Sequence, residues 1–238
     1  GDAYFMAPID ERNSAKVTAT ATITYNHTLK LLDASFQTEI NMAPFLSGGG
    51  QAAMHVNLNE GQGNDWYIAI GSLPISKRMS LSFEVAGITA GSFNCYFVAG
   101  NLNALPADQR RFPLLREYHE DLAQFQDEVE EMDLSRAMGG FAILMGAQYS
   151  LGPISERWWI FKASANATAG FDLMLAQTEC ADYNNGIGIK GWYLQGQAYA
   201  ALSGAVDIHV NLFFHSGWYN IFSLSAAALL QVKLPSPT

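Results

Sequence analysis

The chain has 238 residues, of which 49% are hydrophobic and 15% charged, and its formal net charge is −9. The charged fraction is well below the roughly 25% of ordinary soluble chains, and the hydrophobic content argues against extensive disorder. The sequence contains no basic patch, which argues against nucleic acid as a partner. Its longest uncharged stretches, 137–155 and 208–232, are interrupted by Gly, Pro or polar residues, so neither is a good candidate for a membrane-spanning helix.

Apolar and polar side chains alternate through residues 17–40. The run from Val17 to Tyr25 sets apolar residues against a series of threonines, which predicts a half-buried strand. A turn at Asn26-His27 precedes a second alternating run from Leu32 to Ile40, so we expect an antiparallel hairpin. Further short strands follow up to residue 105, at the spacing found in β-sandwiches and β-barrels.

The period changes between Asp108 and Arg136. This segment holds nine acidic residues and four arginines, which gives it a net charge of −5. Its apolar residues recur at intervals of three and four, which predicts an amphipathic α-helix that packs on the sheet of its own chain. The apolar residues are Leu115, Tyr118, Leu122, Phe125, Val129 and Met132.

Strand-like runs return after residue 139 and are longer than the usual length of roughly 5–6 residues, which favours a curved or barrel-like sheet. The expected strands are Phe141–Ser150, Trp158–Gln177, Trp192–Gly204, Val206–Phe214 and Trp218–Leu234. We predict a mainly β fold, an antiparallel barrel-like sheet or curved sandwich with one inserted amphipathic α-helix. Residues 1–238 would form a single domain, or two sheets (1–105 and 139–238) joined by the helical segment 108–138. The sequence stops directly after an apolar run, so we expect it to be a piece of a longer polypeptide.

Aromatic doublets recur where strands are expected to begin. Adjacent residues of a strand point to opposite faces, so each doublet places one large ring on each side of a sheet. Core packing is the ordinary role of such rings, and a platform that stacks against sugars is the functional alternative. The ligand-binding candidates are therefore the first tryptophan of each doublet: Trp66, Trp158, Trp192 and Trp218.

Other chemical patterns are weak. Cys95 and Cys180 could form a disulfide or could both be free thiols. Asp207 and His209 lie two residues apart on one expected strand face, with Ser203 before them on the same side, and this spacing does not bring a nucleophile within hydrogen-bond reach of a base. We therefore predict no catalytic residues, no metal site and no cofactor, and the chain is not expected to be an enzyme.

Three runs, 66–74 (WYIAIGSLP), 172–180 (DLMLAQTEC) and 191–200 (GWYLQGQAYA), resemble stretches of very large, uncharacterised envelope or secreted proteins of Bacteroidetes-type bacteria. The resemblance is weaker over the acidic segment. It implies an extracytoplasmic location, secreted or at the cell surface, and a chain that continues past Thr238. It brings no catalytic residues to this sequence.

These observations favour a non-enzymatic structural or adhesion module of a bacterial surface protein. The alternatives are a β domain that binds carbohydrate or an apolar ligand, and an outer-membrane-type β-barrel with aromatic girdles and a polar interior. The expected partners are other domains of the same polypeptide or cell-surface proteins. Contact with a membrane is possible but is not the favoured interpretation.

Overall fold

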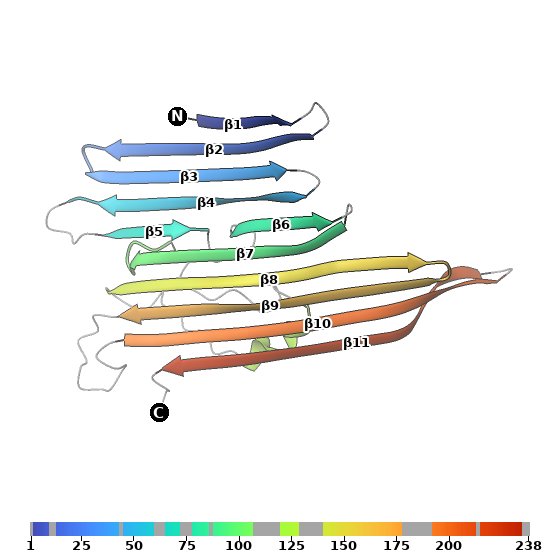
Figure 1. The fold of residues 1–238 in the computed structure, drawn as a ribbon. Coiled ribbons are helices and arrows are strands. Elements are labelled where there is room, and N and C mark those ends of the chain that lie inside the picture. Colours follow the sequence, from blue (N-terminus) through green and yellow to red (C-terminus); the bar gives the residue numbers. More distant parts are fainter. Residues whose placement is uncertain are drawn as a thin grey trace.

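The computed structural model describes residues 2–9, 13–42, 45–59, 65–71, 78–85, 88–106, 120–128, 140–177, 192–212 and 215–234. These residues form one antiparallel sheet of eleven strands (Figure 1). The strands are β1 Asp2–Ile9, β2 Asn13–Asn26, β3 Leu31–Met42, β4 Leu46–Asn57, β5 Trp66–Ile70, β6 Met79–Val85, β7 Ile88–Asn101, β8 Phe141–Trp158, β9 Phe161–Gln177, β10 Trp192–Leu212 and β11 His215–Leu234.

The predicted antiparallel β class is confirmed. The expected hairpin is β2 and β3, in which Val17 pairs with Ile40 and Tyr25 with Leu32. The two strand-rich halves of the chain belong to the same sheet, because β7 pairs with β8 along eleven positions. The sheet is barrel-like only in part: β1 and β11 form its two edges, and no pairing joins them among the described residues.

Two short strands share one position in the sheet. β5 pairs with the Ala52–Val56 part of β4, and β6 pairs with the Leu46–Gly49 part. Both also pair with β7. β5 and β6 therefore occupy one position of the sheet, with Gly71 directly after β5 and Arg78 directly before β6. Gly71 has φ 65°, a left-handed conformation that glycine adopts without steric cost.

The long strands β8 to β11 correct several predicted boundaries. β8 continues to Trp158, and Trp159 (φ 56°) lies in the turn to β9, so this doublet ends a strand instead of opening one. The expected break near Ala205 is absent, because β10 runs on as one strand of 21 residues. A register shift between Val206 and Asp207 absorbs the irregularity in its pairing with β11.

The helical insertion is confirmed over part of its length, but with a different geometry. Residues Glu120–Glu128 form a 3₁₀ helix, η4, instead of the predicted α-helix. Leu122 and Phe125 are three residues apart, which is one turn of a 3₁₀ helix, so both can contact the same surface. Leu122 is fully buried against Tyr199 and Ala201 of β10. The rest of the predicted apolar stripe lies outside the described residues.

The buried core lies on one side of the sheet. The larger cluster spans β5, β7, β8 and β9 and includes Val98, Leu144 and Met174, with Leu102 and Leu105 packed onto it from the segment after β7. The smaller cluster lies where η4 contacts β10 and β11 (Figure 1). Both clusters form where residues outside the strands pack onto the sheet: Leu102 and Leu105 in the larger cluster, and Leu122 of η4 in the smaller one. None of the described helical residues forms a helix long and apolar enough to cross a membrane.

Candidate functional site

The side of the sheet opposite this core is apolar and exposed from β2 to β11. Paired residues of an antiparallel ladder lie on the same face, so the registers assign each side chain to a side. We call this side the apolar face. Leu230, for example, is 67% exposed. Exposed large residues of the apolar face are Ile23, Tyr25, Phe36, Met42, Ile68, Ile70, Phe83, Phe93, Phe97, Tyr149, Leu151, Phe171, Trp192, Leu202, Phe222, Leu224, Leu230 and Val232.

The apolar face carries no Asp, Glu, Lys or Arg among the strand residues whose side chains are described. Its central strands share a ladder of eleven positions: Phe141–Leu151 of β8 pairs along its whole length with both β7 and β9. A soluble monomer normally exposes an apolar patch of at most about 300–600 Å². An apolar surface that continues over this many strands is the kind that marks a contact with another protein, a membrane or a ligand.

Aromatic residues mark one end of the apolar face. Tyr25, Trp66, Phe141 and Trp192 lie in a single row of the ladder that crosses the sheet from β2 to β10. The Trp66 and Phe141 rings contact each other, with centroids 5.8 Å apart. Amphipathic rings are enriched at interfaces where an apolar region meets water.

The other side, which we call the polar face, is covered over the C-terminal strands. Gln148, Thr168, Asp172, Gln195 and Gln197 are all buried there. Burial therefore differs from that of a soluble sandwich, because amides and a carboxylate are covered beside the apolar core while Phe and Leu side chains of the other face are exposed. Transfer of such polar groups from water is unfavourable unless they are hydrogen-bonded.

A buried polar cluster satisfies this requirement in one row of the ladder. Tyr96 pairs with Gly146, Gly146 with Asp172, and Asp172 with Gln197, so β7 to β10 each contribute one position. Gly146 has no side chain, which leaves the space that Tyr96 and Asp172 use to reach each other. A Cβ at this position would lie 2.5 Å from Tyr96 Cε1 and still closer to Asp172 Oδ1.

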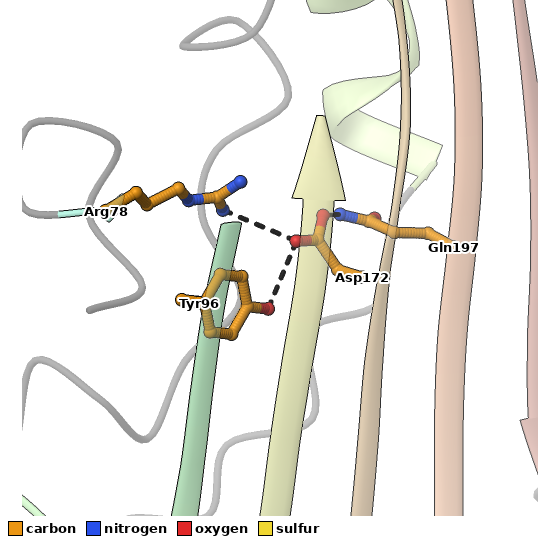
Figure 2. A network of polar contacts seen from close by, with 4 residues as sticks. All are labelled: Arg78, Tyr96, Asp172 and Gln197. Carbon is orange, nitrogen blue, oxygen red and sulfur yellow. Dashed lines mark hydrogen bonds and ion pairs between the residues drawn. The ribbon is translucent and has the colours of Figure 1, made fainter. Parts of the chain in front are cut away.

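Asp172 is the centre of this cluster (Figure 2). Its Oδ1 accepts from the Tyr96 hydroxyl at 3.1 Å and from Arg78 Nη2 at 3.3 Å. Its Oδ2 accepts from Gln197 Nε2 at 2.9 Å. The Arg78 guanidinium also lies over the Tyr96 ring, 4.6 Å from the centroid. The Arg78 and Asp172 side chains have no exposed surface.

Arg78 directly precedes β6, so its ion pair with Asp172 ties the start of β6 to β9 on the polar face. Both carboxylate oxygens are engaged with donors, as a buried carboxylate requires. The Tyr96 hydroxyl donates to this carboxylate, and burial, followed by the charge of Asp172, raises the pKa of Tyr96 well above its usual value. Within the described residues, no group of three or more His, Cys, Asp or Glu side chains is placed to hold a metal ion.

The polar face also contains a cavity of about 420 Å³ between η4 and β9–β11. Small hydroxyl and amide side chains line it, among them Ser164, Asn166 and Ser203, together with Glu120 and Asp121 of η4. These groups are hydrophilic, and two of them are carboxylates.

The structure does not bring the predicted tryptophans together. Trp66 and Trp192 lie in the aromatic row of the apolar face. Trp218 pairs with His209 at the far end of the polar face, with ring centroids 5.0 Å apart. The side chain of Trp158 lies outside the described residues. A single sugar-binding platform built from all four tryptophans is therefore absent from the described part of the sheet.

Other predicted residues are placed as follows. Cys95 is a free thiol on the apolar face, whereas Cys180 lies outside the described residues. Asp207 accepts a hydrogen bond from Asn220 Nδ2 at 2.9 Å. His209 Nε2 lies 3.3 Å from Ser216 Oγ.

Sequence reasoning missed the polar cluster. Asp172 is the only charged residue between Lys162 and Glu179, in a run of small and apolar strand residues. An isolated acid in such a run indicates a buried partner or a function, and this was the available signal. Arg78 could not have been assigned as that partner, because 94 residues separate the two positions.

Comparison with known proteins gives no family model, no curated protein and no solved structure that matches this chain.

Proposed function

We propose that this chain is a membrane-embedded β-sheet that forms part of the wall of an outer-membrane-type β-barrel, with the apolar face in lipid and the polar face toward a lumen. The observation that carries the proposal is the exposed apolar face: it has no described charges, and it backs onto a covered face that buries amides and a carboxylate beside the core. Transmembrane barrels have this alternation, apolar outward and polar inward.

The length of the shared ladder supports the same proposal. Eleven positions of β8 pair on both sides, and a tilted strand needs about 9–11 residues to cross a bilayer. The row from Tyr25 to Trp192 corresponds to one of the two aromatic girdles of such barrels. The role is structural and non-enzymatic, and a bacterial cell envelope is the setting that we propose for it.

The two alternatives, a soluble adhesion module and a sugar-binding domain, each need a feature beyond those described above. A soluble adhesion module would leave the whole apolar face in water unless another body covered it. A sugar-binding domain would need its rings grouped beside one cleft, and Trp66 and Trp218 lie on opposite faces. Lipid accounts for the absence of described charges on the apolar face, whereas a specific protein partner or ligand would be expected to make charged contacts with it.

Fluorescence quenching by brominated lipids tests the proposal. Single-tryptophan variants that retain Trp66 or Trp192 would be reconstituted in phosphatidylcholine vesicles, with the other tryptophans replaced by Phe. Bromine near the lipid carbonyl region should quench both tryptophans, because they lie at one border of the apolar face. A variant that retains only Trp218, on the polar face, is the matched control and should be quenched least. Equal quenching of all three, or a chain that folds as a detergent-free monomer, contradicts the proposal.

A further inference from the structure

The cavity between η4 and strands β9–β11 has a floor of short polar side chains. Asn166, Ser203 and Ser225 are paired across the three strands and form one row of this floor. In the next row, Ser164 of β9 and Ser223 of β11 lie on either side of β10. Paired residues of a ladder lie about 4.5–5.5 Å apart between Cβ atoms, and successive rows of one face lie about 6.5 Å apart. The floor is therefore a regular grid of hydroxyl and amide groups.

The segment η4 places two carboxylates beside this floor. Glu120 and Asp121 line the cavity from η4. Leu122, the next residue, is fully buried and packs with Ala201 of β10. Ser203 follows Ala201 on the same face of that strand, so the apolar contact that holds η4 lies directly next to the polar floor. The position of both acids is therefore fixed by the packing of their neighbour.

The charge of the cavity favours a positively charged ligand. Its described lining residues include no Lys, Arg or His to balance the two carboxylates. Lys162, the basic residue of β9, lies one row beyond Ser164 and opposite Asp207 of β10. Two neighbouring carboxylates repel each other, and a cation between them accepts charge-assisted hydrogen bonding from both sides. A cationic group is therefore the complement that this lining lacks.

The size and chemistry of the cavity favour a small organic ligand that carries several hydroxyl groups. The cavity volume is about 420 Å³, which lies within the range of about 300–1,000 Å³ for ligand pockets and far exceeds the share of about 30 Å³ for one water. The hydroxyl and amide groups of the floor can each donate and accept, so they suit ligand hydroxyls. No aromatic ring is among the described lining residues, so stacking does not supply the affinity here.

We infer that this cavity binds an amino sugar, a compact polyhydroxylated ring with a protonated amine. The ammonium group lies between Glu120 and Asp121, and the ring hydroxyls bond to the floor. This site differs from a platform of tryptophans, because charge and hydroxyl contacts replace ring stacking. The inference goes beyond the proposed membrane role and does not depend on it, because the cavity lies on the polar face.

Isothermal titration calorimetry of the full chain in detergent micelles tests the inference. The probes are glucosamine, glucose, N-acetylglucosamine and cyclohexylamine, at about pH 6, where an amine is protonated. Glucose and N-acetylglucosamine keep the ring hydroxyls without the charge, whereas cyclohexylamine keeps the charge without the hydroxyls. The Kd of glucosamine should be at least about ten-fold lower than that of the other three, because hydrogen bonds to a charged group add to those of the hydroxyls.

Variants of the chain assign the binding to this cavity. Glu120→Gln, at an exposed side chain, should raise the Kd of glucosamine at least about ten-fold and remove its advantage over glucose. Asp33→Asn is the matched control, because it removes a carboxylate of the same face over β3, away from the cavity. The double variant Ser203→Ala with Ser225→Ala should weaken glucosamine and leave cyclohexylamine unchanged. Urea titration of each variant checks that it folds.

Four results would overturn the inference. The first is an equal Kd for glucose and glucosamine, and the second is an equal Kd for cyclohexylamine and glucosamine. The third is the absence of saturable heat with every probe. The fourth is saturable Ca²⁺ binding that displaces glucosamine, which would assign the carboxylates to a metal ion. Brominated-lipid quenching on the same preparation tests the membrane role separately: glucosamine binding without quenching removes that role and retains the cavity, whereas quenching without binding does the reverse.

Discussion

The polar face has two parts with the same alternation and different surroundings. Over β7 to β10 it is covered, and Asp172 is 1% exposed. Over β2 and β3 it is open, and the side chains of Thr20, Asp33 and Gln37 are exposed. The strands of both parts alternate in the same way, so alternation does not determine burial. The polar face is buried where residues outside the strands, such as Leu102, Leu105 and Leu122, pack onto it. The ion pair of Arg78 and Asp172 lies in this buried part.

The two parts also differ in what holds them. The covered part contains close packing around Leu144 and Met174 and a carboxylate with three donors. In the open part, the described residues include a close contact at the surface between His55 and Asp33, an ion pair when the imidazole is protonated. Substitutions in the covered part should therefore affect the free energy of unfolding strongly, and those in the open part weakly, unless they change the apolar face.

The largest effect is expected for Asp172→Ala. This change leaves the Arg78 guanidinium buried without its carboxylate, and breaking a buried pair costs about 3–5 kcal/mol. The free energy of unfolding would be measured by urea titration in detergent micelles, with tryptophan fluorescence as the signal. The double variant Arg78→Met with Asp172→Asn is the control and should lose less than the sum of the single losses, because no unpaired charge remains. Additive losses would mean that the two side chains are not coupled.

Phe36→Arg should have the next largest effect. Phe36 lies on the apolar face in the row of Ala52, Ile70 and Met145, near the middle of the shared ladder. Arginine on the lipid face at the bilayer midplane costs about 2–4 kcal/mol. Folding efficiency into vesicles, measured by resistance to added protease, reports this loss.

The matched control for this change is Gln37→Arg. Gln37 is the next residue of β3, is also exposed and lies on the polar face at nearly the same depth. An exposed polar position tolerates the change within about 0.5 kcal/mol. If both arginines were tolerated equally, the apolar face would not be in lipid, and the contrast between the two faces would have no functional meaning.

A smaller loss is expected for Gly146→Ala in the covered part. The added methyl group would meet Tyr96 Cε1 at 2.5 Å, so Tyr96 or Asp172 must move. Overpacking of this kind costs about 1–3 kcal/mol. Gly196→Ala is the control, because its nearest neighbour is the movable end of Leu173 at 3.2 Å. Urea titration should show the loss for Gly146→Ala alone, and an equal loss at Gly196 would contradict the account of the polar cluster.

The sequence predicts the local part of this structure well. The alternation from Val17 to Ile40 specifies the β2–β3 hairpin, because period and turn are encoded within a few residues. The intervals around Leu122 locate the helical insertion, although not its 3₁₀ geometry. What alternation cannot specify is which side of a strand is covered, and the half-buried strand expected from Val17 has its apolar Ile23 74% exposed.

The polar cluster could not be predicted because its members are far apart in the chain. Arg78 precedes β6, and it meets Asp172 through the successive pairings of β6 with β7, β7 with β8 and β8 with β9. Gly146 matters only because its register places it between Tyr96 and Asp172. Register of this kind depends on the whole sheet, and no local pattern in the sequence carries it.

The smallest effect is expected for Asp33→Ala in the open part of the polar face. The His55 Nδ1 to Asp33 Oδ1 distance is 2.6 Å, shorter than the 3.3 Å of the buried pair. Distance alone would therefore rank the surface pair as the stronger one. Water screens exposed charges and can solvate either partner after the other is removed, so such pairs contribute about 0–1 kcal/mol.

Urea titration of Asp33→Ala beside Asp172→Ala makes this comparison directly, and His55→Ala should match Asp33→Ala, since each removes the same weak contact. A loss at Asp33 as large as that at Asp172 would mean that the polar face is also covered over β3 and β4 in the folded assembly. The stability that each pair contributes would then depend on whether the pair is buried in the assembly, and not on the alternation of its strand. A small loss, by contrast, places the open half of the polar face in water, where the lumen of the proposed barrel requires it to be.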